Sequence, residues 1–228
     1  MTTYVNANTN AFAGTGTVTY TIPFAQTAGD CFLFVVNLYN SSTFSAPTSV
    51  HDTAGNTYNA PIQTLGNTNE PTTCFLYAVS NIKAAAANAN TVTMTLPSGA
   101  QFPQAFIIEY TGASITSLVN ASNGVGTPTT SPISTPITTT ISNCELVGII
   151  TGNGGDGDPL AIGSGFTSRY NSGDGWFVAG DASAATATSY TFDPTSGSPG
   201  FTTTFVVALE PGSGPTIHSD PIFFSMDF

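Results

Sequence analysis

Charge is the property that this sequence has least of. Only 7% of its 228 residues are charged, against about 25% in an ordinary soluble domain. Lys83 and Arg169 are the only basic side chains, and with 13 acidic residues the formal net charge is −11. Binding to nucleic acid and to an anionic membrane surface both depend on Lys and Arg. We therefore expect neither nucleic acid nor a membrane among its partners.

Long apolar runs are also lacking. No stretch reaches the ~18 apolar residues that a membrane-spanning helix requires. Residues 1–8 contain neither the basic region nor the apolar core of a secretory signal. Either such a signal is missing from this sequence, or the protein leaves the cell that makes it by another route.

Cysteine is scarce, with Cys31, Cys74 and Cys144 as its three occurrences. An odd number at wide spacing fits neither a disulfide framework nor a zinc site. We expect buried free thiols that pack as small hydrophobic side chains. A disulfide between Cys31 and Cys74 stays open as the alternative.

Two similar apolar runs, residues 104–112 and 204–212, are the strongest indication of secondary structure in the sequence. Each has Phe followed by two β-branched residues near its start, Glu near its end, and Gly as its last residue. Short runs of β-branched and aromatic residues bounded by turn residues are typical of strands buried on both faces. Residues 31–39 and 145–151 have the same character. We predict four inner strands.

The rest of the sequence predicts further strands and no amphipathic helix. Val18, Tyr20 and Ile22 alternate with Thr, which indicates a strand with one wet face. The proline-containing residues 117–136 are interpreted as an edge crossing, and residues 50–58 carry the turn chemistry of a hairpin. About ten strands at this spacing predict an all-β fold. We expect one antiparallel β-sandwich domain of jelly-roll type over residues 1–211.

The segment after residue 211 differs from this body. Residues 212–215, Gly-Ser-Gly-Pro, form a hinge before an apolar stretch. A large apolar side chain contributes roughly 1.5–3 kcal/mol when it is buried, so either the sandwich itself or a neighbouring subunit must cover this stretch. We predict a C-terminal arm over residues 212–228. Its partner-binding residues are Ile222, Phe223, Phe224, Met226 and Phe228.

Two patterns were considered for catalysis. Glu109 and Glu210 take matching places in the two similar runs, and a glycosidase needs two carboxyl groups about 5–9 Å apart. Solvated carboxylates at strand exits are the simpler interpretation. His51 and Asp52 suggest a relay, but a serine enzyme also needs a nucleophile elbow, which residues 163–166, Gly-Ser-Gly-Phe, do not supply. We interpret His51 as a turn residue and predict no catalytic residue.

Two patterns were considered for ligands. Asp156 and Asp158 offer oxygen atoms to calcium, but the ligand order and bidentate Glu of a calcium loop are missing, so an acidic turn is the simpler interpretation. Trp176, Tyr170 and Phe177 could form a platform for stacking sugars, but core packing is the favoured interpretation. We expect no metal site and no cofactor.

Six segments carry a resemblance to a known family, and they are residues 50–58, 90–96, 106–112, 144–148, 163–169 and 205–211. In order and spacing they resemble a β-sandwich domain that recurs in bacteriophage structural proteins and bacterial surface proteins. The resemblance covers roughly residues 15–211 and rests on strands and turns. It implies a non-enzymatic module for display, adhesion or assembly, and it transfers no catalytic residue.

The sequence departs from the surface-protein members in two respects. Those members usually follow a secretion signal, whereas this sequence starts directly at Met1, and it adds the aromatic arm. Both departures favour a virion component that is made in the host cytoplasm, such as a capsid decoration or a fibre. Its partners would be other copies of itself or other virion proteins, with a host-surface glycan as a further possibility. A carbohydrate-binding or adhesin module is the alternative, and a jelly-roll glycosidase is the third interpretation.

Overall fold

The computed structural model describes residues 1–12, 15–39, 45–69, 72–152 and 159–212. Strands and a single 3₁₀ helix, Pro199–Phe201, make up the regular structure of these residues. The strands of the first half are β1 (Thr3–Ala11), β2 (Thr17–Thr21), β3 (Cys31–Tyr39), β4 (Ser49–Asp52), β5 (Gln63–Asn67), β6 (Thr72–Val79), β7 (Thr91–Thr95) and β8 (Gln101–Thr111). Those of the second half are β9 (Val119–Val125), β10 (Thr135–Thr138), β11 (Cys144–Thr151), β12 (Leu160–Ala161), β13 (Thr167–Asn171), β14 (Phe177–Ala184), β15 (Ser189–Phe192), β16 (Thr195–Ser196) and β17 (Thr203–Leu209).

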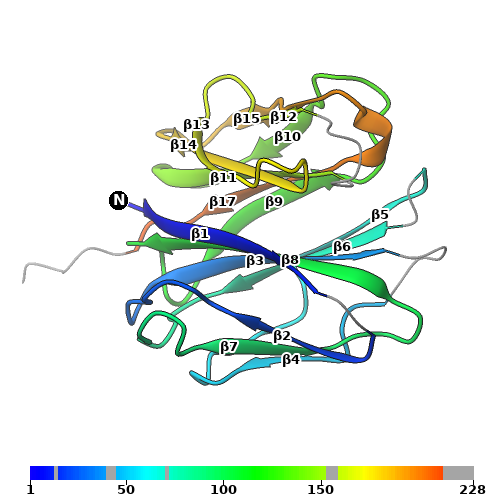
Figure 1. Cartoon of the computed structure of the whole chain (residues 1–228). Coiled ribbons are helices and arrows are strands. Elements are labelled where there is room, and N and C mark those ends of the chain that lie inside the picture. Colours follow the sequence, from blue (N-terminus) through cyan, green and yellow to red (C-terminus); the bar gives the residue numbers. More distant parts are fainter. Residues whose placement is uncertain (13–14, 40–44, 70–71, 153–158, 213–228) are drawn as a thin grey trace, which may run out of the picture.

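The strands form stacked antiparallel sheets (Figure 1). The first inner sheet has the order β1-β8-β3-β6-β5, and the outer sheet of the first half has the order β2-β7-β4. The second inner sheet has the order β13-β14-β11-β17-β9, and it is covered by two short pairs, β10-β15 and β12-β16. The two inner sheets lie next to each other in the middle of the stack, as Figure 1 shows. The fold is therefore all-β and layered, as predicted.

The two halves of the chain follow the same path. If the strands are numbered within each half, both inner sheets have the order first-last-third-sixth-fifth. These strands are β1-β8-β3-β6-β5 in the first half and β9-β17-β11-β14-β13 in the second. In each outer layer the second strand pairs with the seventh, β7 in one half and β15 in the other. The fourth strand pairs with β7 in the first half and with β16, which directly follows β15, in the second. The chain therefore contains one strand arrangement twice.

The hydrophobic core lies in layers between these sheets. Alternate residues of β3 point to opposite sides, so that Phe32 and Phe34 pack towards the outer sheet while Leu33 and Val35 pack towards the second half. Between the inner sheets, Phe106 of β8 stacks on Phe177 of β14 with ring centroids 5.4 Å apart. This burial on both faces explains why the inner strands are nearly continuous apolar runs.

The four predicted inner strands are confirmed. Residues 104–112 and 204–212 correspond to β8 and β17, and each of these strands lies between the first and third strands of its half. Their similarity in sequence therefore reflects equivalent places in the two halves. Val18, Tyr20 and Ile22 are buried while the Thr residues between them are exposed, which confirms the one-sided strand.

Two local predictions need correction. Residues 50–58 do turn, with Gly55 at φ +79° and an Asp52 carboxylate oxygen accepting from the Asn56 amide at 2.9 Å. They do not close a hairpin, because β4 pairs with β7 rather than with β5. A further strand, β1, was not predicted because its sequence is rich in Thr and Asn. It lies at the edge of the first inner sheet.

The boundary predicted at residue 211 is not tested by this structure. Glu210 and Pro211 are still joined to the body, through a hydrogen bond from the Ser114 amide and a bridge to Ala113. Residues 213–228, which hold the predicted partner-binding side chains, lie outside the described residues. The arm therefore stays a prediction.

Candidate functional site

An aromatic cleft opens at one end of the interface between the two halves. It has a volume of about 320 Å³ and is lined by Ala11, Phe12, Tyr39, Thr72, Phe102, Gln104 and Trp176. The first six residues lie at or next to the ends of β1, β3, β6 and β8, which come together at one end of the first inner sheet. Trp176 precedes β14 and comes from the second half. The cleft therefore exists only because the two halves are packed together.

Phe102 is the most exposed aromatic ring at this cleft. Its exposed fraction is 64%, and its ring centroid lies 6.3 Å from that of Tyr39, which is 36% exposed. Between Asn37 and Tyr39 the pairing of β3 with β8 slips, so that an extra residue of β8 bulges at Phe102 and Pro103. Bulges of this kind redirect a side chain away from the regular pleat. The bulge therefore holds Phe102 out of the core.

The backbone of Phe102 is strained as well. Its φ is +45°, a left-handed conformation that costs a non-glycine residue about 1–2 kcal/mol. Strained residues with bulky side chains persist where the surrounding structure enforces them, often at sites of function. The strained bulge therefore keeps an aromatic ring exposed at the cleft.

The cleft is suited to an apolar ligand. None of its seven lining residues is charged, and four of them are aromatic. Aromatic rings bury large apolar areas and accept edge-to-face partners. The polar side-chain groups of the lining residues are the amide of Gln104, the hydroxyl groups of Tyr39 and Thr72, and the indole N–H of Trp176. The arrangement can bind an apolar or aromatic group.

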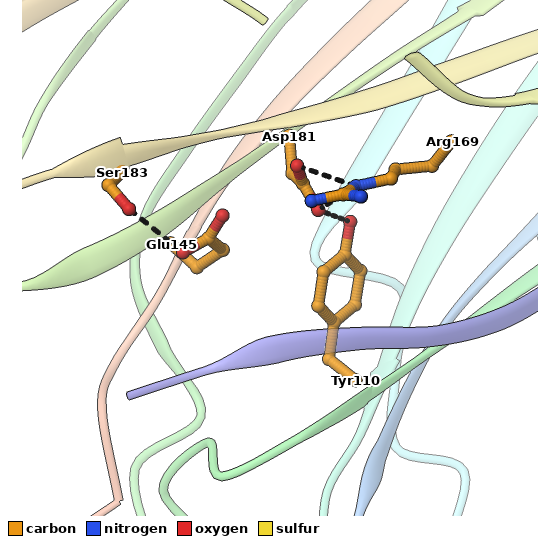
Figure 2. Close-up of polar contacts among 5 residues, drawn as sticks. All are labelled: Tyr110, Glu145, Arg169, Asp181 and Ser183. Carbon is orange, nitrogen blue, oxygen red and sulfur yellow. Dashed lines mark hydrogen bonds and ion pairs between the residues drawn. The ribbon is translucent and has the colours of Figure 1, made fainter. Parts of the chain in front are cut away.

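A polar cluster joins the two halves near the end of β8, whereas the cleft lies near its start. Figure 2 shows the side chains of this cluster. The buried carboxylate of Asp181 accepts hydrogen bonds from Nε of Arg169 at 2.9 Å and from the hydroxyl of Tyr110 at 3.2 Å. Tyr110 belongs to β8, whereas Asp181 and Arg169 belong to β14 and β13. The Arg169 guanidinium also lies over the ring of Tyr4, 5.4 Å from its centroid. The cluster therefore ties the first half to the second.

Glu145 forms the second part of this cluster. Its carboxylate accepts a hydrogen bond from the hydroxyl of Ser183 at 3.5 Å, and both side chains are separate from the Asp181 contacts in Figure 2. Burial raises the pKa of Glu145 to about 7, and the neighbouring Asp181 adds to the rise. Glu145 also lines a cavity of about 340 Å³, together with Met1, Asn143, Cys144, Ser183, Ala185 and Pro211. This cavity lies beside Pro211, close to Gly212, the last described residue.

The paired carboxylates considered for glycoside hydrolysis have different surroundings. Glu109 is fully buried on the side of β8 that faces the outer sheet, and it accepts a hydrogen bond from the Thr27 amide at 3.3 Å. Burial raises the pKa of Glu109 to about 7. Glu210 instead approaches the side chain of Asn120 at 3.4 Å. Glu109 is therefore not the solvated carboxylate that was expected, and a sugar could not reach it.

His51 and Asp52 do not form a relay. They are neighbours on β4, so their side chains point to opposite faces, with His51 exposed and Asp52 buried. His51 is a strand residue, which corrects the predicted turn. Burial acts to raise the pKa of Asp52, but hydrogen bonds from Asn90, Asn56 and Tyr58 outweigh it and hold the pKa below its usual value. Asp52 therefore organises the turn that follows it.

The three aromatic residues considered as a sugar platform are divided between the core and the cleft. Phe177 is fully buried, and both Phe177 and Tyr170 pack on Phe106, whose ring centroid lies 5.2 Å from that of Tyr170. Trp176 lies in the aromatic cleft with Phe102. Core packing is thus confirmed for Phe177, and Trp176 joins aromatic residues that the sequence reading had not grouped with it.

The remaining candidates concern metals and thiols. Asp156 and Asp158 lie outside the described residues. Across the described ranges, no group of three or more His, Cys, Asp or Glu side chains is arranged to hold a metal ion. Cys31, Cys74 and Cys144 are buried and free, so the Cys31–Cys74 disulfide is not formed. Burial raises the pKa of the Cys74 thiol to about 11. In the same part of the chain, no helix has the length and apolar character to cross a membrane.

Comparisons of this chain with protein-family models, with curated proteins and with solved structures found no match. The sequence reading missed the cleft residues Phe12, Tyr39 and Phe102 because they lie far apart along the chain. One signal was present, since an aromatic residue followed by proline at the start of an inner strand marks a bulge or an edge.

Proposed function

We propose that this chain is a non-enzymatic structural protein of a virus particle, such as a capsid decoration, a fibre or a related exterior part. It assembles through protein–protein contacts that include the aromatic arm. The observation that carries the proposal is the strand order, which recurs in both halves. The resemblance to phage structural domains described above points in the same direction.

The strand order supports a jelly-roll type for each half. A jelly roll is a double sheet of eight strands built from two Greek keys, and it is common in viral capsid and lectin domains. In the first half, the order first-last-third-sixth in one sheet and second-seventh-fourth in the other is that of a jelly roll, except that the fifth strand pairs with the sixth. The second half differs in one further respect, because its fourth strand pairs with β16. A rigid pair of such units is a suitable building block for an assembly.

The packing of the two halves and the low content of charged residues also support a structural role. The two halves share a continuous apolar core with a stacked Phe106–Phe177 pair and a Tyr110–Asp181 contact across it. Contacts of this kind hold the two halves together as one unit. Its few charges leave assembly to apolar contacts, which the arm residues Phe223, Phe224 and Phe228 are suited to make.

Sedimentation of two forms of the protein tests the assembly role. The full chain should sediment as an oligomer, and a chain of residues 1–212 should sediment as a monomer with unchanged circular dichroism. A full chain with Ile141→Ser, at an exposed apolar residue of the body, is the control and should assemble normally. A monomeric full chain would contradict the assembly role.

The virion role has its own test, the gene order around the coding sequence. Neighbouring capsid, portal and tail genes support it. Genes for cell-wall anchoring or secretion instead favour the adhesin alternative.

Glycan binding is the second candidate function, favoured by Trp176 lining a cleft with the exposed rings of Phe102 and Tyr39. Aromatic faces pack against the apolar faces of sugars. A glycan array with the wild-type protein and the Trp176→Ala variant tests it. Binding that disappears in the variant supports this candidate, and no binding by the wild type removes it.

A further inference from the structure

We infer that the aromatic cleft is the receptor for the apolar arm residues 222–228 of a second copy of this chain, so that copies join head to tail. This inference rests on the proposed assembly role and adds the surface on which the arm docks. Four observations carry it, namely the position of the cleft, the reach of the arm, the chemistry of both, and the strain at Phe102.

The cleft and the origin of the arm lie at opposite ends of the body. The Gly212 amide donates a hydrogen bond of 2.8 Å to the carbonyl oxygen of Gly112, directly after β8. Phe102 lies near the start of β8. A strand rises by about 3.4 Å per residue, so about 34 Å separate residue 102 from residue 112. The arm leaves at one end of the first inner sheet, and the cleft opens at the other.

This distance disfavours docking of the arm on its own body. From residue 212 to residue 222, the first apolar residue of the anchor, a fully extended chain spans about 33–36 Å. Reaching the cleft of the same molecule would require a straight spacer along the whole sheet, with Pro215 and Pro221 within it. A neighbouring copy can bring its cleft to the arm without that constraint. Head-to-tail contacts of this kind close into rings or continue as filaments.

The chemistry of the arm matches that of the cleft. The cleft is uncharged and mostly aromatic, with a volume of about 320 Å³. The arm anchor is Ile-Phe-Phe-Ser-Met-Asp-Phe, in which five of the seven residues are large and apolar. Phe rings pair with other aromatic rings in edge-to-face or offset arrangements. Insertion of one or two rings would cover Phe102 and Tyr39, which are exposed in the single chain.

The strain at Phe102 supports a binding role. The residue combines φ +45° with a 64% exposed ring, so its conformation is unfavourable and its side chain gains little from the protein's own core. Asn or Gly would be more favourable at this φ. An aromatic residue at this place is understandable if its ring contacts a partner.

The cavity beside Glu145 is the competing receptor. It lies next to Pro211, so the arm of the same molecule reaches it easily. It is less suitable for Phe rings because its wall includes the buried carboxylate of Glu145 and the side chain of Ser183. Packing a ring against Glu145 would remove the remaining solvent from an acidic group that is already buried. This cavity therefore serves as an alternative outcome of the test.

The test mixes two proteins that each keep one side of the contact. Residues 1–212 retain the cleft without the arm, and the full chain with Phe102→Asn retains the arm without the aromatic receptor. Asn tolerates positive φ, so this variant should fold normally. Each protein alone should be monomeric in light scattering, and the mixture should form a 1:1 heterodimer that grows no further. A synthetic peptide of residues 213–228 should bind residues 1–212 about tenfold or more tightly than the same body with Phe102→Asn.

The outcomes separate this inference from the proposed function. If the full chain with Phe102→Asn assembles as well as the wild type, and residues 1–212 do not assemble, the arm docks elsewhere and the inference fails while the assembly role survives. A peptide that binds both bodies equally also overturns the inference, and a Glu145→Gln body then tests the competing cavity. If the full chain itself is monomeric, the assembly role fails first. Ile141→Asn is the matched control for an exposed apolar residue outside the cleft.

Discussion

The hydroxyl of Tyr110, on the last strand of the first half, donates a hydrogen bond to the carboxylate of Asp181 in the second half over 3.2 Å. Asp181 is 3% exposed, and its ion-pair partner Arg169 is 35% exposed. The carboxylate thus depends on one buried neutral donor and one partly solvated cation. The contact is one of several polar links between the halves, such as Gln63 to Ser122 and Asn67 to Thr202, around an apolar interface core.

Removing this hydroxyl should weaken the protein measurably. In Tyr110→Phe the buried Asp181 carboxylate loses one of its donors, and a hydrogen bond to a charged group contributes about 1.5–3 kcal/mol. We expect the free energy of unfolding in urea to fall by that amount. Tyr190→Phe is the control, because the Tyr190 hydroxyl bonds the backbone of Thr186 at an exposed place. An equal loss in both variants would contradict a special role for Tyr110.

Stability should decrease as the pH rises from about 4.5 to 7. Burial raises the pKa of both Glu109 and Glu145 to about 7, whereas a carboxyl group of Glu in an unfolded chain has a pKa of about 4.3. The folded state therefore holds more protons in this interval, and its stabilisation, complete below pH 4.3, is lost as the pH rises through 7. Thermal unfolding at pH 5 and pH 8 measures the difference. The melting temperature should be higher at pH 5.

Glu109→Gln isolates one of these two groups. The amide keeps the shape of the protonated acid but does not ionise, so the variant should lose part of the decrease between pH 5 and pH 8. Glu210→Gln is the matched control and should keep the wild-type dependence. If Glu109→Gln retains the full dependence, the buried Glu109 is not its source.

Gly148 should not tolerate a methyl group. A Cβ atom at this position of β11 would lie 2.5–2.7 Å from the ring of Phe192, which covers the second inner sheet. We expect Gly148→Ala to reduce the free energy of unfolding by about 1–3 kcal/mol, as overpacked cores do. Adding Phe192→Leu should recover part of this loss. Gly66→Ala is the control, since its nearest atom would be 4.0 Å away.

Substitution of Phe102 should abolish assembly while leaving stability nearly unchanged. Phe102→Gly relieves the positive φ and removes a mostly exposed ring, so the free energy of unfolding should change by less than about 1 kcal/mol. Truncation of a Phe buried in the core would instead lower the free energy of unfolding by about 3–5 kcal/mol. Assembly of the full chain should nevertheless be lost. Urea denaturation and sedimentation of the same preparation provide both measurements.

The inner strands were predictable because burial on both faces leaves a plain mark in the sequence. β3, β8, β11 and β17 are nearly continuous apolar runs, and the likeness of β8 to β17 already indicated equivalent places. Edge strands such as β1 and β9 were missed or read as crossings, because their polar residues resemble loops. The duplication itself became visible only through the pairing of the strands, which no local pattern encodes.

The cleft was less predictable than the fold. Tyr39, Phe102 and Trp176 come together through the register of β3 with β8 and the packing of the two halves. Trp176 was singled out with Tyr170 and Phe177 because they are close in sequence, yet strand alternation sends Phe177 into the core. Distances along a chain say little about neighbours in a layered β fold, where most contacts join distant segments.

Photo-crosslinking from the arm tests the head-to-tail contact most directly. A photoreactive phenylalanine analogue at position 224 is introduced into ¹⁵N-labelled full chain, which is mixed with unlabelled full chain and irradiated. The account predicts crosslinked peptides that join a labelled arm to unlabelled residues around Tyr39 and Phe102. Crosslinks found only within one chain, or only at residues 143–145 beside the second cavity, would contradict it.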